Sequence, residues 1–201
     1  MEPFSTLSGI AVPLDEANID TNQLCPSRFM KVPKGPSFAR ILLHDRRFNA
    51  DGSEKLDYIL NQEPYRRAAI AVAGRNFGVG SSRETAVFGL IAFGIRSVIA
   101  PNFGDIFFNN ALKNGMLPVR LPAATVDALM QQLIDQPGAR LAVDLPNQTV
   151  TGHDGTIHRF EIEPLSKHRL LRGLDEIAHT QEYHGAITRF EDGQKQSFPW
   201  L

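Results

Sequence analysis

The sequence predicts an α/β fold in which a mixed sheet is flanked by helices. Three observations predict it. Short apolar runs alternate with helical segments between residues 68 and 138, which is typical of parallel strands joined by right-handed crossovers. Further strands with a hairpin turn follow, so the sheet is expected to be mixed. The end of the chain reads as helical, and we expect residues 1–201 to form a single domain with a helical C-terminal extension.

Each strand of the central part is predicted by a short apolar run. The run AAIAVAG, which a glycine stops, is typical of a strand that is buried on both faces. The runs of this kind lie at residues 8–13, 68–74, 97–101 and 117–121.

Helices are expected at residues 82–93, 105–115 and 125–138. The first is apolar on nearly every side, which indicates that it is buried. Gly115 is well placed to stop the second helix, and the third has Thr125 as a cap and a Pro-Gly stop.

The chain then returns to strands before its helical end. Residues 141–145 and 148–162 read as strands, and the turn Asp154-Gly155 closes a hairpin within the second segment. Residues 164–191 read as mostly helical.

The composition indicates a cytoplasmic globular protein. A formal net charge of −1 gives no bias toward a nucleic-acid partner, and no apolar run approaches the length of a membrane span. The N-terminal residues show no signal-peptide pattern. The one cysteine, Cys25, excludes an internal disulfide and an iron–sulfur cluster held by several thiolates of this chain alone. We predict no metal site in the chain.

A glycine-rich loop, GRNFGVGSSRET at residues 74–85, is the strongest candidate for function. Its spacing fits neither a P-loop nor a dinucleotide fingerprint. Ser81 and Glu84 fit a helix capping box, which stabilises by ~1 kcal/mol. Against this purely structural interpretation, Arg83 would lie in the first turn of a buried helix, where an anionic ligand would offset the cost of burial. Both interpretations stay open on the residues alone.

The same loop carries a resemblance to a known family. The motif GRNFGVGSSRE, followed by GIRSVIAPNFGDIFFNNALKNGMLPV, resembles the small subunits of 3-isopropylmalate dehydratase, in the aconitase superfamily. The segments VPLDEANIDTNQLCPSRF, HDRRF and LRGLDEIAHT extend the resemblance over almost the whole chain.

The resemblance implies a swivelling β/β/α domain similar to the C-terminal domain of aconitase. It implies that the domain closes over a [4Fe-4S] cluster carried by a separate large subunit, and not by this chain. By position, Ser81 is then the catalytic base and Arg83 holds a substrate carboxylate, with Ser82 alongside. Gly78 and Gly80 let the substrate approach the backbone.

The implied activity is that of a hydro-lyase of leucine biosynthesis. It interconverts 2-isopropylmalate and 3-isopropylmalate, which are small hydroxy dicarboxylates, and it is active only as a heteromer with the large subunit. The family usually has Cys at the position of Val79, His at Thr85, Asp at Asn22 and an aliphatic residue at Cys25. These departures leave open another substituted malate, of the citraconate, 2-methylmalate or homoaconitate type. A non-catalytic binding domain is the third alternative.

Other polar motifs have plain structural interpretations. Cys25 is expected to be a small buried hydrophobe, and the Glu176–His179 pair to lie on a solvated helix face. Residues 44–47 form either an anionic site or a polar turn with local salt bridges. Residues 31–37 form a specificity loop or a flexible linker, and residues 197–201 dock on a partner or pack on the domain.

Overall fold

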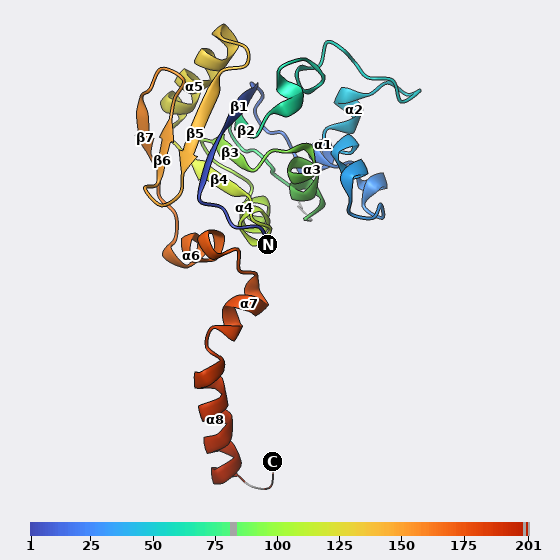
Figure 1. Ribbon diagram of the computed structural model, residues 1–201. Coiled ribbons are helices and arrows are strands. Elements are labelled where there is room, and N and C mark those ends of the chain that lie inside the picture. The colour runs from blue at the N-terminus through green and yellow to red at the C-terminus, as the bar shows by residue number, and fades with distance from the viewer. Residues whose placement is uncertain (81–83, 199, 201) are drawn as a thin grey trace.

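In the computed structural model, which describes residues 1–80, 84–198 and 200, seven strands form one mixed sheet (Figure 1). Their order across the sheet is β4-β3-β2-β1-β5-β6-β7. The strands are β1 (Thr6–Leu14), β2 (Ile70–Ala73), β3 (Ser97–Ala100), β4 (Leu117–Arg120), β5 (Arg140–Asp144), β6 (Thr149–Thr151) and β7 (Ile157–Arg159). The predicted strands and the hairpin are confirmed.

Strand β1 joins a parallel half of the sheet to an antiparallel half. Its second half pairs in parallel with β2, with Val12 opposite Ala71, and β2, β3 and β4 continue in parallel. Its first half pairs antiparallel with β5, with Ser8 opposite Ala142, and β6 and β7 continue in antiparallel order. One long strand therefore serves both halves, and the sheet is mixed as predicted.

Helices cover both faces of the parallel half (Figure 1). Along β2, Ile70 and Val72 point into a core shared with α5 (Ala123–Asp135), because side chains alternate along a strand. Ala71 and Ala73 point into a second core on the opposite face. The helices on that face are α1 (Thr21–Leu24), α2 (His44–Arg47), α3 (Thr85–Phe93) and α4 (Asp105–Lys113).

The long connection between β1 and β2 forms a lobe beside the second core. It holds α1 and α2 together with short 3₁₀ helices, namely η1 (Ser27–Phe29), η2 (Pro36–Arg40), η3 (Ile59–Asn61) and η4 (Tyr65–Arg67). The sequence predicted no helix here, because each piece is too short to show a helical period.

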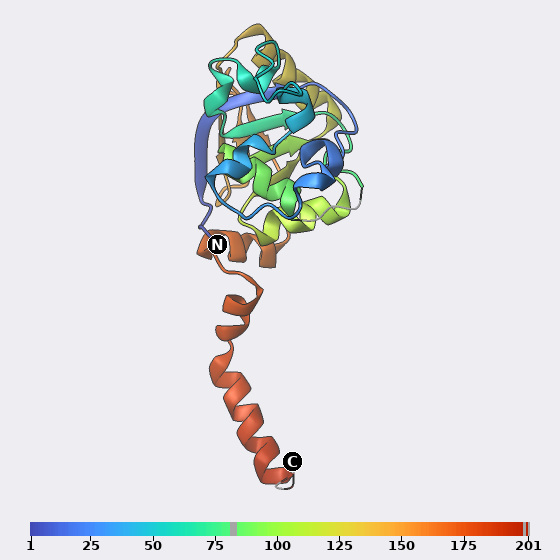
Figure 2. The same cartoon turned by 90° about the vertical axis from the view of Figure 1, so that its right-hand side faces the viewer.

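The C-terminal helices leave the body of the molecule one after another (Figure 2). Helix α6 (Pro164–Arg172) still packs on it, with Leu170 buried and its carbonyl accepting from the Phe4 backbone N–H at 2.9 Å. Helices α7 (Glu176–Gln181) and α8 (His184–Ser197) have no buried residue among those described. The end of the chain is helical as predicted, and the division into one domain with an extension stays a prediction.

Two helix starts differ from the prediction. Helix α5 begins at Ala123 after Pro122 and has no side-chain cap, so Thr125 lies inside its first turn and the predicted Thr cap is wrong. Helix α3 begins at Thr85, three residues later than predicted, with Glu84 as its N-cap residue. The predicted cap at Ser81 lies outside the described residues.

No helix in the described part of the chain combines the length and the hydropathy that a bilayer span requires.

Candidate functional site

Three loops meet where β1, β2 and β3 end, at the edge of a parallel sheet where ligands of α/β proteins commonly bind. The loop after β2 lies between the other two. On one side, its Gly78 N–H donates to the Ile19 carbonyl at 2.7 Å, and its Val79 carbonyl accepts from the Thr21 N–H at 3.0 Å. On the other side, the Gly104 N–H donates to the Phe77 carbonyl at 2.9 Å. Main-chain pairing therefore continues beyond the strands.

Three asparagines, one from each loop, lock this arrangement. The Asn76 side-chain amide donates to Asn18 Oδ1 at 2.7 Å, and Asn102 Nδ2 donates to Asn76 Oδ1 at 2.9 Å. Asn102 Oδ1 in turn accepts from the Asn76 backbone N–H at 2.7 Å. The chain thereby passes through Asn76 in the left-handed region, with φ of +58°, which asparagine tolerates better than most residues. The sequence analysis missed this cluster.

Glycine is needed at positions 78 and 80 of the loop for different structural reasons. Gly78 has φ of +71°, and a Cβ there would lie 2.3 Å from the Phe107 ring. Gly80 has φ of +102°, and a Cβ would meet only Thr21 Oγ1, at 3.4 Å. Gly78 is thus required by packing as well as by its backbone conformation, whereas Gly80 is required mainly by its backbone conformation. Their contact with a substrate stays a prediction.

Ser81, Ser82 and Arg83 lie outside the described residues. The described residues on either side of them are Gly80 and Glu84. Glu84 is followed directly by Thr85, the first residue of α3. The Glu84 carboxylate accepts a hydrogen bond from Asn114 Nδ2 at 3.3 Å, which ties the start of α3 to the end of α4.

A pocket of about 330 Å³ borders both ends of that segment. Pockets of this size hold small metabolites. Asp20 lies at its wall and caps α1, where it forms a capping box with Gln23. The lining residues are Asp20, Thr21, Asn22, Cys25, Met30, Val79, Gly80 and Thr85.

Cys25 lies at the pocket with little exposed surface. It is 4% exposed, and burial raises the pKa of its thiol, an effect that a hydrogen bond with Thr85 partly opposes. A thiol with a raised pKa is a poor nucleophile and a poor metal ligand at neutral pH. The prediction of a small buried residue is confirmed, and this one thiol does not fit an iron–sulfur cluster, which needs several thiolates.

The positions that depart from the family pattern come together here. Asn22 and Cys25 come from α1 and its end, whereas Val79 and Thr85 come from the loop and the start of α3. All four line the same pocket. The sequence indicated each departure separately, but their proximity depends on the packing of α1 against α3.

Residues 44–47 form helix α2 and do not gather into an anionic site. Arg46 pairs with Glu16, with NH2 at 2.7 Å from Oε1, and Asp45 pairs with Arg28. Salt bridges are present as the second interpretation expected, but they join residues that lie far apart in the sequence, and the segment is a short helix and not a turn. Arg47 differs from Asp45 and Arg46, because it is only 5% exposed.

The Arg47 guanidinium is a buried structural hub. Its Nε donates to Asn61 Oδ1 at 3.0 Å, and its NH1 donates to the carbonyls of Ala39 and Leu42 at 2.7 and 3.1 Å. Burial lowers the pKa of Arg47 to about 10, so the side chain stays charged at neutral pH. Its donors close the turn before α2, which holds the lobe together.

The remaining predicted motifs separate in the structure. Glu176 pairs with Lys113 at 2.9 Å on the surface, as expected of a solvated face. His179 contradicts that expectation, because its side chain is only 18% exposed and contacts Glu182.

The predicted loop at residues 31–37 is largely exposed and follows Met30, a pocket residue. At the C-terminus, Phe198 and Trp200 contact each other edge to face and are 42% and 76% exposed. The specificity role of the loop and the docking role of the C-terminus both stay predictions.

Comparison with known proteins identifies relatives over the whole chain. The family model of the aconitase C-terminal domain matches residues 1–124, and a second model, described as LeuD_N, matches residues 127–164. The chain is 50% identical over 200 residues to the 3-isopropylmalate dehydratase small subunit of Gluconacetobacter diazotrophicus, covering 100% of this chain and 97% of that one. It is 47% identical over 201 residues to the subunit of the same name from Paracoccus denitrificans, covering 100% of both chains.

A solved structure supports the fold. The crystal structure of 3-isopropylmalate dehydratase from Methanocaldococcus jannaschii superposes with a TM-score of 0.65 at 21% identity, covering 92% of this chain and 98% of that one. The α/β architecture, with a mixed sheet and flanking helices, is therefore shared with this structure.

Proposed function

The chain belongs to the aconitase C-terminal domain family, among the small subunits of 3-isopropylmalate dehydratase, and we propose that it completes the active site of a two-chain hydro-lyase. The enzyme interconverts 2-isopropylmalate and 3-isopropylmalate in leucine biosynthesis, by dehydration and rehydration. We also propose that residues 1–201 act as one domain and that the protein is cytoplasmic.

The position of the pocket carries the proposal. It lies at the carboxyl ends of parallel strands and is bordered by Gly80 and Thr85, between which the Ser-Ser-Arg segment runs. The first turn of α3 starts at the same place, and the N-terminus of a nine-residue helix presents free N–H groups and partial positive charge. This setting suits a substrate that carries carboxylates.

Each residue of the segment has a chemical task in this proposal. The proton next to a carboxylate is weakly acidic, so its removal needs a positioned base and stabilisation of the charge that develops. Ser81 takes that proton. Arg83 binds a carboxylate through two parallel hydrogen bonds, Ser82 lies alongside, and the missing side chain at Gly80 lets the substrate reach the backbone.

The large subunit supplies what this chain does not hold. The sequence has one cysteine, and Cys25 is buried with a raised thiol pKa, so the chain offers no set of thiolates. A [4Fe-4S] cluster on the large subunit would act as the Lewis acid for the departing hydroxyl group. The small subunit alone is then inactive.

One observation favours a second candidate substrate. Asn22, Cys25, Val79 and Thr85 depart from the family pattern and all line the pocket. A change of pocket shape by one methylene alters substrate discrimination by roughly 10–200-fold. The alternative is a related hydro-lyase that acts on another substituted malate, such as a citraconate, 2-methylmalate or homoaconitate type of acid.

Reconstitution with the large subunit tests the proposal. We expect the purified chain alone to hold no iron–sulfur cluster and to show no dehydratase activity. We expect the reconstituted pair to turn over isopropylmalate with the highest kcat/KM among the substituted malates. A higher kcat/KM for citraconate or homoaconitate would select the second candidate. A pair that assembles with an intact cluster and turns over none of these acids would leave a non-catalytic binding domain.

A further inference from the structure

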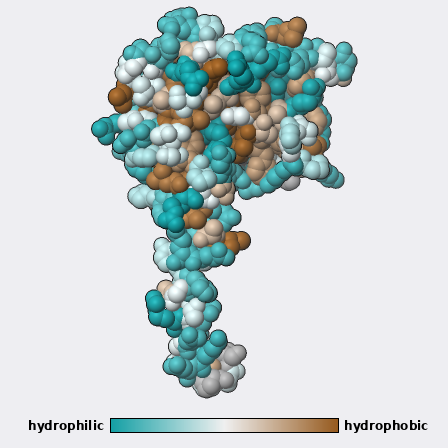
Figure 3. Space-filling model, in the orientation of Figure 1, coloured by the Kyte–Doolittle hydropathy of each residue, from teal (hydrophilic) through white to brown (hydrophobic). Residues whose placement is uncertain are grey.

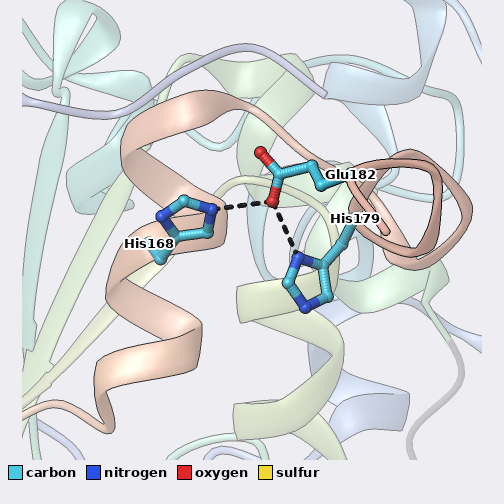
Figure 4. A group of neighbouring side chains, drawn as sticks. All are labelled: His168, His179 and Glu182. Carbon is cyan, nitrogen blue, oxygen red and sulfur yellow. Dashed lines mark hydrogen bonds and ion pairs between the residues drawn. The ribbon is translucent and has the colours of Figure 1, made fainter. Parts of the chain in front are cut away.

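Two histidines and a glutamate converge where α6 meets α7. His168 comes from α6, His179 from α7, and Glu182 is the C-cap residue of α7. Both imidazoles point at the same carboxylate oxygen (Figure 4). His168 Nε2 lies 2.9 Å and His179 Nδ1 lies 3.1 Å from Glu182 Oε2. None of the three residues lines the pocket described above.

The three side chains match the ligand set of a transition-metal site. One atom from each, two imidazole nitrogens and a carboxylate oxygen, lies within 4.8 Å of the other two. Zinc–ligand bonds of roughly 2.0–2.2 Å imply separations of about 3.3–3.5 Å between the ligand atoms of a tetrahedral site. The observed nitrogen–oxygen distances need to open by only a few tenths of an ångström for an ion to enter.

The three side chains of the cluster are partly exposed to solvent. The side chains of His168 and Glu182 are 42% and 29% exposed, whereas that of His179 is 18% exposed. A three-residue ligand set with solvent access leaves a fourth position for water. The nearest competing cation, Arg172, lies 3.7 Å from Oε1, the carboxylate oxygen that the histidines do not contact.

The donor atoms of the cluster, two imidazole nitrogens and a carboxylate oxygen, also indicate which cation it would take. Two imidazoles with one carboxylate prefer Zn²⁺, Ni²⁺ and Cu²⁺ over the hard ions Mg²⁺ and Ca²⁺, which favour oxygen ligands.

We propose that His168, His179 and Glu182 form a site for a divalent transition-metal ion, with Zn²⁺ as the expected ion. The bound ion would fasten α7 to α6. Because α7 has no buried residue among those described, the site is a main attachment between the extension and the body, together with the Lys113–Glu176 ion pair. A bound metal orders α7 without taking part in the dehydratase reaction. No metal site was predicted from the sequence, because Glu176 and His179 lie within one helix and the sequence does not show that His179 meets α6.

Metal binding to the full-length chain without an affinity tag tests the proposal. Equilibrium dialysis with Zn²⁺ alone, followed by metal analysis, should give one equivalent per chain. Co²⁺, used as a spectroscopic probe, should show the intense visible bands of four- or five-coordinate cobalt. His179→Gln should weaken Zn²⁺ binding by about a hundredfold or more, since loss of even an outer-shell partner costs 10–100-fold. His184→Gln, an exposed histidine two residues beyond Glu182, is the matched control and should bind as the wild type does.

A second measurement separates a site from adventitious binding. Zn²⁺ should slow backbone amide exchange in residues 176–182 of the wild type, and not in His179→Gln. Binding that His184→Gln weakens as strongly as His179→Gln does would overturn the proposal. So would the absence of Zn²⁺ binding at micromolar concentration, in which case the cluster is a hydrogen-bonded link and nothing more.

Discussion

The loops at the carboxyl ends of β1, β2 and β3 differ sharply from the C-terminal segment that begins at α7. The loops are joined to one another by main-chain hydrogen bonds and by the side chains of Asn18, Asn76 and Asn102. The extension has no buried residue among those described, and Ile177 and Phe190 are 73% and 68% exposed. The face of the extension seen in Figure 3 is largely hydrophilic.

The loops and the extension differ in how much buried contact stabilises them. The described parts of the loops that border the pocket lie on a core of fully buried side chains such as Phe77 and Phe107, which fixes the geometry of these parts before a substrate arrives. The extension gains little from burial and is attached through polar contacts. Pre-organisation is what a catalytic loop requires, whereas a surface helix can be lost without harm to the core.

A single methyl group added at Gly78 is expected to destabilise the fold strongly. Gly78→Ala places a Cβ 2.3 Å from the Phe107 ring in a backbone with φ of +71°. The unfavourable φ costs about 1–2 kcal/mol, and the overpacking adds about 1–3 kcal/mol. Urea unfolding of the variant should therefore show a loss of about 2–5 kcal/mol.

Gly155→Ala is the matched control for this change. Gly155 has a similar φ of +84° but nothing within 4 Å of its Cβ position, so only the backbone term of about 1–2 kcal/mol applies. Equal losses for the two variants would contradict the idea that close packing, rather than turn geometry, holds the loop.

The fold was largely predictable because its central elements are marked by local patterns. The apolar runs of β2, β3 and β4 indicated buried parallel strands, and Asp154-Gly155 indicated the hairpin between β6 and β7. The double pairing of β1 was not predictable, since it depends on partners that lie far away in the sequence. The buried role of Arg47 was missed for a related reason: its acceptors, Asn61 and the carbonyls of Ala39 and Leu42, are brought to it only by the folded lobe.

The site was predictable in part. The spacing of glycines around residues 74–85 pointed to a functional loop, and the structure places a pocket beside it. The asparagine cluster had a weak signal, because each member follows the end of a predicted strand by a few residues. No sequence period connects Asn22 and Cys25 to Val79 and Thr85. The cluster of His168, His179 and Glu182 likewise requires two helices to meet.

The ion pair between Glu16 and Arg46 should contribute much less to the stability of the fold than packing does, although Glu16 lies in one of the three loops at the pocket. The pKa of Glu16 is lowered, mainly by its hydrogen bond with Arg46, so the pair stabilises the fold above the ordinary carboxyl pKa of 4.5. This contribution is lost as the pH falls through the lowered folded-state pKa, because the unfolded chain then binds the proton first. At neutral pH, Glu16→Gln should cost about 0.5–1 kcal/mol.

Denaturant unfolding as a function of pH and salt measures this effect. The gap between Glu16→Gln and the wild type should close in acid and should shrink in 1 M salt. A gap that is unchanged at low pH would show that the substitution acts through something other than the charge of Glu16.

Removal of the last helix should give the smallest effect. A chain that ends at Tyr183 lacks α8, none of whose described residues is buried. Its free energy of unfolding should lie within ~0.5 kcal/mol of the full chain. Leu170→Ala in α6, a residue with 0% exposure, serves as the comparison and should cost about 2–5 kcal/mol. A truncation that costs as much as Leu170→Ala would remove the distinction between body and extension.

Turnover of Ser81→Asn in the complete two-chain enzyme is the most direct test of the central claim, that this loop supplies the base of the reaction. Asparagine can cap a helix as serine does, but its amide cannot accept the substrate proton as a base. We expect the variant to stay folded and assembled at a temperature well below its melting transition, while kcat falls by roughly two to four decades. Full turnover would contradict the catalytic assignment of Ser81.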